Sequence, residues 1–464
     1  MASLSQLLYT ARDALSAQSY GLGVAGQNVA NANTPGYVRR EAILQNVVLG
    51  TQTYGGVEAV GIRRATDQYL DRRVFAASSL ASAANERDGQ LGKIEPLFND
   101  FAGTGLSDAL DKLFGAFSSV AANPSDPTTR INVLQRAEQV SAHIRQVADT
   151  IASAREEQLS RGRAVVDDIN QKASQIAELN RQIAVAEASG GDAADLRDRL
   201  NQMLLGLSTQ VDVRTFTNSD GGLVVQAAGT TLVEGDNARS LSIDLAANGN
   251  MRLFASSGSG PPTEITKYLT GGTLAGIREA RDVDLAATTQ KLDQLAFDLA
   301  TAVNSQHAAG VGLDGVSGRP LFAITATVQG AARAIQLDSQ MVGQPDRFAA
   351  AANVAELPGG SDNAALLSAL SISKTASGGT RTISEAYSDI VGDFGMRKAS
   401  AASEGQLRQG VLSQVEALRE SESGVSLDEE MISLTRYQRA YEASAKVIST
   451  VDELLRELIA RVGS

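Results

Sequence analysis

From residue 427 to residue 462 the chain contains neither proline nor glycine, which predicts one uninterrupted helix about 54 Å long. Ser426 and Glu429, at its start, have the spacing of a capping box. Apolar side chains then recur every three or four positions and share one helix face. These residues are Leu427, Met431, Leu434, Tyr441, Ala445, Ile448, Leu455 and Ile459. A terminal helix with such a face must pack against other helices.

The opposite end of the chain repeats this pattern. Ser3 and Gln6 have capping-box spacing, and a second row of apolar side chains begins directly after Ser3. This row consists of Leu4, Leu8, Ala11, Leu15, Leu22, Ala25 and Val29. We expect both ends to form one terminal coiled-coil domain, in which the two rows are the assembly seams. The alternative is that both helices belong to the core of a single large domain.

The first helix should end near Asn33, because the residues that follow favour a tight turn. Proline at the second position and glycine at the third position of a four-residue turn indicate type II geometry. The turn motif consists of Asn33, Thr34, Pro35, Gly36 and Tyr37. A short hairpin is expected after it, over residues 45–62, where glycines interrupt two strand-like runs.

In the middle of the chain, the sequence pattern changes from helical to strand-like and then back to helical. Helical patterns cover residues 66–101, 106–120, 127–189, 274–306 and 383–419. Short runs between turn residues predict strands over residues 211–216, 223–227, 230–233, 241–245 and 251–254. The predicted fold class is therefore mainly α with a β insert, in an elongated molecule whose two ends meet at one pole.

The same pattern predicts four parts. Residues 1–44 and 423–464 form the terminal coiled-coil domain, and residues 45–207, 274–310 and 383–422 form a helical, rod-like domain. Residues 208–273 form a small β domain, and residues 311–382 form a loop-rich segment attached to the helical domain.

The net charge of −12 argues against nucleic acid as a partner, because phosphate binding requires clustered lysine and arginine. The chain has no cysteine, which excludes disulfides and thiolate metal sites. No cleavable signal peptide is recognisable at the start of the sequence. The uncharged segment over residues 14–32 contains too many polar side chains to span a membrane, so no membrane partner is expected.

No catalytic constellation stands out. The two histidines, His143 and His307, lie in different helical regions, and we expect a structural or surface role for both. Gly21, Gly23 and Gly26 match the spacing of a dinucleotide-binding loop, but a helical pattern precedes them where that loop requires a strand. We interpret these glycines as sites of close helix packing. Neither enzyme activity nor a cofactor is therefore expected.

Three groups of aspartates are the remaining candidates for acid–base chemistry. They consist of Asp126, of Asp167 with Asp168, and of Asp192 with Asp195 and Asp198. Each group lies at an expected helix end or on an expected exposed face, so helix capping or solvation is the default interpretation.

Two segments at opposite ends of the chain resemble the signatures of bacterial flagellar rod, hook and hook-associated proteins. The first is Ala-Asn-Ala-Asn-Thr-Pro-Gly-Tyr at residues 30–37, and the second covers residues 423–430 and 436–448. Further segments are similar to the FlgK family of hook-associated proteins, at the hook–filament junction: residues 195–200, 271–274, 304–307, 310–322, 362–363 and 383–387. The chain is therefore identified as a member of this family over most of its length.

The resemblance implies a structural protein that forms the junction ring between hook and filament through its terminal helices. It implies export in an unfolded state by the flagellar type III apparatus. The implied location is the extracellular flagellum, reached without a cleavable signal peptide. The implied partners are further copies of the chain in a ring, the hook protein, the second junction protein and an export chaperone that binds the C-terminal helix.

Three alternatives stay open from the sequence. One is another flagellar axial protein, such as the hook protein or the second junction protein, although the β insert and residues 304–315 argue against both. Another is a dinucleotide-dependent enzyme that uses the glycines beginning at Gly21. The third is a host-facing adhesin or a coiled-coil binding module, which would function without assembly on a hook.

Overall fold

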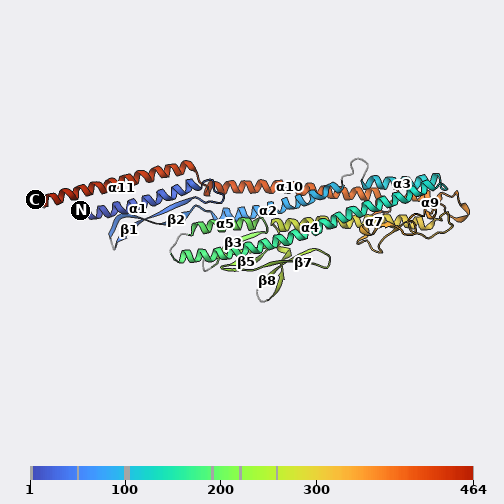
Figure 1. Ribbon diagram of the computed structural model, residues 1–464, viewed down its shortest axis with the longest axis horizontal. Helices are drawn as coiled ribbons and strands as arrows, with labels where there is room; N and C mark the ends of the chain where they lie inside the picture. Colours follow the sequence, from blue (N-terminus) through green and yellow to red (C-terminus); the bar gives the residue numbers. More distant parts are fainter. Residues whose placement is uncertain are drawn as a thin grey trace.

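The computed structural model describes residues 4–49, 52–98, 105–189, 193–218, 222–257 and 260–462. The molecule is elongated, and both ends of the chain lie at the same pole (Figure 1). Long helices run along its length, and the strands from the middle of the chain lie along one side. The predicted fold class, mainly α with a β insert, is confirmed.

Two helices and a hairpin make up the pole that holds the chain ends. α1 (Leu4–Asn31) and α11 (Leu427–Val462) lie side by side and run in opposite directions (Figure 1). β1 (Arg40–Leu49) and β2 (Gln52–Arg64) form an antiparallel hairpin that packs against α1. The domain boundary predicted after residue 44 falls inside β1, so the hairpin lies with the terminal helices rather than with the rod.

The rod is built mainly from five helices. They are α2 (Gln68–Ile94), α3 (Leu106–Ala122), α4 (Pro127–Ala188), α7 (Leu285–Ala309) and α10 (Ile383–Ser423). The long helix α4 begins as the sequence predicts. The carboxylate of Asp126 accepts a hydrogen bond from the Thr128 N–H at 2.9 Å, and Pro127 occupies the first turn.

α5 (Ala194–Ser208) leads from α4 into two small antiparallel sheets. The first contains β3 (Val213–Thr217), β4 (Leu223–Ala227), β5 (Thr230–Glu234) and β6 (Asn237–Ala238). The second contains β7 (Leu241–Leu245), β8 (Met251–Ser257) and β9 (Gly260–Glu264). The five predicted strands are present, whereas β6 and β9 were not predicted. β9 contains two prolines, which sheets tolerate at an edge such as this one.

The helix predicted over residues 274–306 is divided in the structure. α6 (Gly272–Glu279) and α7 are joined by a π-helical turn, Ala280–Asp284. Asp284 is fully buried in this turn and pairs with Arg87 of α2 at 2.7 Å and with Arg397 of α10 at 3.2 Å. The turn therefore fixes α7 to two other helices in the middle of the rod.

The loop-rich residues 311–382 pack at the far end of the rod (Figure 1). Their regular elements are short: β10 (Phe322–Ala323), α8 (Ala331–Ala334), β11 (Gln336–Leu337) and α9 (Asp362–Ala369). His307 of α7 holds this segment, since its Nδ1 lies 2.7 Å from the Arg319 carbonyl oxygen and its Nε2 accepts a hydrogen bond from the Ala349 N–H at 3.0 Å. Burial lowers the pKa of His307 to about 4, so the imidazole is neutral. The structural role expected for His307 is confirmed.

Candidate functional site at the joint between the terminal helices and the rod

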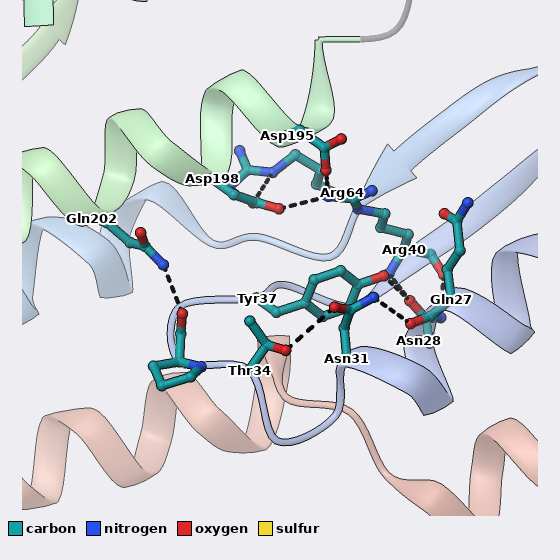
Figure 2. Close-up of polar contacts among 11 residues, drawn as sticks. Gln27, Asn28, Asn31, Thr34, Tyr37, Arg40, Arg64, Asp195, Asp198 and Gln202 are labelled. Carbon is teal, nitrogen blue, oxygen red and sulfur yellow. Dashed lines mark hydrogen bonds and ion pairs between the residues drawn. The ribbon is translucent and has the colours of Figure 1, made fainter.

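Three segments that are far apart in the sequence meet where the terminal helices join the rod. They are the turn motif after α1, the start of α5, and the connection between α10 and α11. Figure 2 shows the turn and α5 on either side of the arginines that link them. All three segments contain residues on which the resemblance to flagellar proteins rests, and their contacts give a physical reason for these motifs.

The turn motif has the geometry that its sequence predicts. The Tyr37 N–H donates to the Thr34 carbonyl oxygen at 3.1 Å, and Gly36 has a φ of +79°, as the third position of a type II turn requires. Gln202 of α5 donates from Nε2 to the Pro35 carbonyl oxygen at 2.6 Å. A Cβ added at Gly36 would lie 2.2 Å from this Nε2, so glycine is needed both for the backbone conformation and for contact with α5.

Asn28, near the end of α1, connects the turn to the hairpin. Its Nδ2 donates to the Arg40 carbonyl oxygen at 2.8 Å, and its Oδ1 accepts from the Arg40 N–H at 3.0 Å and from the Tyr37 hydroxyl at 2.8 Å. The Asn28 side chain is thus an additional partner for the first backbone groups of β1. Burial raises the pKa of Tyr37, and the nearby Arg40 partly opposes this shift. The sequence analysis did not predict Asn28 as a residue of this site. A carboxamide side chain beside the row of apolar residues on the same helix is the signal that could have identified it.

Arg40 and Arg64 lie directly opposite each other in the hairpin. Like charges in this position repel each other unless an acid lies between them. Asp198 of α5 supplies that acid, since it accepts hydrogen bonds from Arg40 Nη2 and from Arg64 Nε, both at 2.8 Å. Asp195 accepts a further hydrogen bond from Arg40 at 2.5 Å. Burial acts to lower the pKa of Arg40, but the two carboxylates outweigh it and raise the pKa, so the guanidinium stays charged.

These contacts correct one expectation for the aspartates. Asp195 is exposed, with 80% of its side-chain surface accessible, but Asp198 is buried, with 10% accessible. A solvated role is therefore wrong for Asp198, because it pairs with the buried Arg40 and the partly buried Arg64. Asp192 lies outside the described residues, and Asp168 pairs with Lys172 on α4.

Arg39 links the same joint to the start of α11. Its backbone N–H donates to the carbonyl oxygen of Ser423, the last residue of α10, at 3.0 Å. Its guanidinium pairs with Glu430 at 3.0 Å and with Glu429 at 2.8 Å. Neighbouring arginines thus point to different partners: Arg39 binds α11, and Arg40 binds α5. The joint fixes the orientation of α1, the hairpin and α11 relative to the rod.

α1 and α11 approach each other closely at one glycine. A Cβ added at Gly21 would lie 2.6 Å from Cε1 of Tyr437, whose ring occupies the space above the glycine. The close packing expected at Gly21 is therefore present. Around Gly23 and Gly26 no heavy atom lies within 4 Å of an added Cβ among the described residues, so close packing within one chain is wrong for these two glycines.

The predicted seam residues divide between buried and exposed positions. On α1, Ala11 and Ala25 are buried, Leu22 is exposed, and Leu4, Leu8, Leu15 and Val29 are partly exposed. On α11, Leu434, Ile448 and Leu455 are partly buried, whereas Leu427, Met431, Tyr441, Ala445 and Ile459 are exposed. The buried stripe of α11 includes Glu430 and Val451, which the predicted row does not contain. On each helix, the predicted row of apolar residues thus lies at the edge of the face that contacts the other helix, and not at its centre.

The polar groups of the joint serve to connect elements. In the part of the chain that the structure describes, no group of histidine and carboxylate side chains is arranged to hold a metal ion. Nor does any described helix combine the length and the hydropathy needed to cross a bilayer. Because its hydrogen bonds and ion pairs connect the hairpin to α5 and to α11, the site is a mechanical joint, next to which α11 exposes apolar side chains.

The comparisons with known proteins agree with this arrangement. Residues 91–322 match the model of the flagellar hook-associated protein FlgK helical domain. Residues 8–37 match the flagella basal body rod protein model, and residues 419–461 match the flagellar basal body rod FlgEFG protein C-terminal model. The two terminal matches contain the turn motif and α11, the segments that meet at the joint.

Relatives and a solved structure extend the likeness to the whole chain. Flagellar hook-associated protein 1 of Bacillus subtilis strain 168 is 27% identical over 508 residues, which cover 100% of this chain and 99% of that protein. The protein of the same name from Escherichia coli K12 is 27% identical over 550 residues, covering 98% and 100%. The flagellar hook junction protein FlgK from Burkholderia pseudomallei shares the fold, with a TM-score of 0.67 and 17% identity over 75% of this chain and 100% of that chain. The chain therefore belongs to the FlgK family of flagellar hook-associated proteins, which are structural proteins of the flagellum and not enzymes.

Proposed function

We propose that the protein assembles with further copies of itself into the junction ring between hook and filament, with α1 and α11 forming the inner tube. The observation that carries this proposal is the apolar surface of α11 on both sides of its contact with α1. On one side the exposed residues are Leu427, Met431, Tyr441 and Ile459, and on the other they are Val447, Leu454 and Leu458. A helix with two apolar flanks suits neighbours on both sides.

Covering these side chains supplies the free energy of assembly. Each large aliphatic side chain that becomes fully buried contributes about 1.5–3 kcal/mol. Association costs about 4–15 kcal/mol in lost translational and rotational freedom. Several such side chains per interface are therefore needed, and the flanks of α11, together with the exposed Leu7 and Leu22 of α1, supply them.

The proposal also includes how the chain is exported and which flagellar proteins lie next to it. The protein is exported unfolded by the flagellar type III apparatus and takes an extracellular position between the hook protein and the second junction protein. Before assembly, an export chaperone covers the apolar flanks of α11, as a groove covers an amphipathic helix. Loss of chaperone binding on deletion of residues 427–462 supports this step, and unchanged binding contradicts it.

The test is filament formation in cells that lack the gene. We expect hooks without filaments, flagellin released into the medium, and rescue by the full-length chain but not by a chain without residues 427–462. Normal filaments in the deletion strain contradict the junction function. Absence of the hooks themselves indicates the alternative, an axial protein that acts earlier in assembly.

A matched pair of variants separates the role of the flank from general effects of surface change. The assembly variant replaces Leu427, Met431, Tyr441 and Ile459 with serine. The control replaces four exposed side chains of the loop-rich segment with serine: Val342, Val354, Leu366 and Ile372. We expect the assembly variant to be stable but to leave hooks without filaments, and the control to support filaments. Equal filament formation by both variants contradicts the proposal.

A further inference from the structure

The outward face of α10 contains no charged residue over most of the helix. Figure 1 shows this helix along one long edge of the rod. Between Ile390 and Leu418, every exposed residue is uncharged. The exposed residues of α4, the other long helix of the rod, include Glu138, Glu156, Arg163 and Asp167. Since a helix at the surface of a soluble protein normally turns charged side chains toward water, the outward face of α10 is unusual in this molecule.

The charged residues of the same stretch are all at least partly buried. They are Asp393, Arg397, Lys398, Glu404, Arg408 and Glu416. Asp393 pairs with Lys291 of α7 at 3.1 Å. Lys398 pairs with Asp88 of α2 at 2.6 Å, and Arg397 pairs with the buried Asp284. Contacts within the rod thus use the charged residues of α10 and leave its uncharged residues facing outward.

Large apolar side chains form a row on this outward face. Met396, Leu407 and Leu418 recur every 11 residues, which is close to three helical turns, so they lie on one side of the helix. They are 68%, 65% and 44% exposed, and Val411 beside them is 42% exposed. We define the α10 stripe as the exposed residues from Gly392 to Leu418. It is about 40 Å long, and an uncovered apolar stripe of this length marks a surface that another helix covers.

Three glycines leave gaps in the α10 stripe. Gly392, Gly395 and Gly410 are exposed, and no heavy atom of the described residues outside the adjoining helix backbone lies within 4 Å of a Cβ added at any of them. Glycine in the interior of a helix costs about 1 kcal/mol relative to alanine. Packing within the described part of the chain therefore gives no reason for these glycines, whereas the close approach of a second helix does.

The α10 stripe is complementary to a second copy of itself in the reverse direction. When Ser403 of one copy lies opposite Ser403 of the other, Leu407 lies level with Ala399, and Met396 lies level with Gly410. In a parallel pair, each large side chain would lie level with its own equivalent, and each glycine with a glycine, so that ridges would meet ridges. An uncharged face can also pair with its own copy without repulsion, as a two-fold symmetric contact requires. A charged partner surface would bury charges that the stripe cannot neutralise.

We infer that the free protein forms an antiparallel, two-fold symmetric dimer through the α10 stripe. This inference goes beyond the proposed function, because the stripe lies on the rod and not on the terminal helices of the inner tube. A stripe of about 40 Å by 10 Å offers on the order of 400 Å² per copy. A standard stable interface buries about 800 Å² per partner, so the dimer is weak and reversible, and it forms at high protein concentration.

Cross-linking of the purified chain tests the contact and its direction. Since the chain has no cysteine, each single variant carries one thiol for a short bismaleimide. Ser403→Cys, at the two-fold axis, should give a cross-linked dimer by itself. Leu418→Cys should give none by itself, but should be joined to Ser388→Cys, with which it lies level, when the two variants are mixed. Ser153→Cys, exposed on α4, is the control and should give no dimer. Equal yields from Ser403→Cys and Ser153→Cys overturn the dimer, and a dimer of Leu418→Cys alone overturns the antiparallel direction.

Sedimentation equilibrium of the unmodified chain and of charged variants gives an independent measurement. Leu407→Glu should raise the dissociation constant of the dimer at least about tenfold, because it buries an unpaired charge. Leu366→Glu, at an exposed position on α9, is the matched control and should leave the constant unchanged. A native chain that stays monomeric at the highest concentration at which it dissolves overturns the inference, as do equal constants for the two variants.

A size swap tests the register of the pair. Gly410→Met fills the gap level with Met396 and should weaken the dimer at least about tenfold through overpacking. Adding Met396→Ala to the same chain should restore association. A Cβ at Gly410 has open space within the described residues of one copy, so the swap leaves the fold of the monomer intact. Unchanged association of Gly410→Met overturns this register.

The outcomes are separate from those that test the proposed function. Leu407→Glu leaves the apolar flanks of α11 unchanged, so cells that carry this variant should still form attached filaments. Attached filaments together with a weakened dimer support a contact of the free protein. Loss of filaments with a folded Leu407→Glu chain would show that the stripe is covered in the ring, and would overturn its assignment to the free dimer.

Discussion

Arg40 and Arg64 share one carboxylate, that of Asp198, from opposite positions on two neighbouring strands. The hairpin that carries the arginines packs against α1, and Asp198 belongs to α5 of the rod. One buried carboxylate therefore connects both strands of the hairpin to the rod.

Replacing Asp198 with alanine should destabilise the joint by about 3 kcal/mol, because it removes the carboxylate shared by Arg64 and the buried Arg40 and leaves Arg40 with only the exposed Asp195. Asp195→Ala is the matched control, since its exposed carboxylate contributes about 0–1 kcal/mol. The free energy of unfolding, from urea titration of the purified chain, checks both values. Equal effects of the two substitutions would mean that Asp198 does not hold the arginines.

A second pair of substitutions tests the contact between α1 and α11. Gly21→Ala places a Cβ 2.6 Å from the Tyr437 ring, so the ring must move, and overpacking of this kind costs about 1–3 kcal/mol. Gly23→Ala meets no described atom within 4 Å and should stabilise α1 by up to about 1 kcal/mol, because alanine favours helix. Helicity and thermal unfolding of the two variants should change in opposite directions. A loss of stability in both would indicate a partner near Gly23.

Capping and turn residues at the ends of helices explain why much of the fold could be predicted. Asp126 and Pro127 start α4, and the glycines after residue 189 follow its end, so one helix of the rod was clear from the sequence. The turn at Gly36 was likewise predicted, since proline and glycine at fixed positions select one backbone geometry. Such signals lie within a few residues of the feature that they cause.

Contacts between distant residues were not predictable in the same way. Nothing near Arg40 in the sequence indicates that its partner is Asp198, because the pairing arises only when α5 packs on the hairpin. The predicted row on α11 is displaced for a related reason. Because α11 has apolar residues on both flanks, the spacing of its apolar residues does not identify which face contacts α1. Only the position of α1 in the structure shows that Glu430 and Val451 lie on the contact face.

Stability should fall in acid through His307. Its folded-state pKa of about 4 is below the ordinary value of 6.5, so the unfolded chain binds a proton first as the pH falls. The contribution of the neutral imidazole is complete above pH 6.5 and is lost as the pH falls toward 4. Between pH 7 and pH 5 the loss amounts to about 2 kcal/mol. Urea titration at both pH values should show this loss in the native chain.

His307→Gln removes the titrating group and should remove this part of the pH dependence, whatever its own effect on stability. His143→Gln, on α4, is the control and should keep it. If the difference between pH 7 and pH 5 is the same in both variants, His307 is not the source.

The terminal helices should be mobile until the protein assembles. In a single copy, α11 is covered along one stripe by α1 and exposes apolar side chains on both flanks, whereas α4 contributes a long row of buried residues to the cores of the rod. Local opening costs little free energy where few apolar contacts are lost. We therefore expect amides of residues 4–31 and 427–462 to exchange with solvent much faster than those of α4 in the monomer. In assembled flagella they should become protected while α4 changes little, because neighbouring copies then cover the flanks. Strong protection of both termini in the monomer would show that the α1–α11 pair is stable alone, and the apolar flanks would then be unnecessary for ordering it.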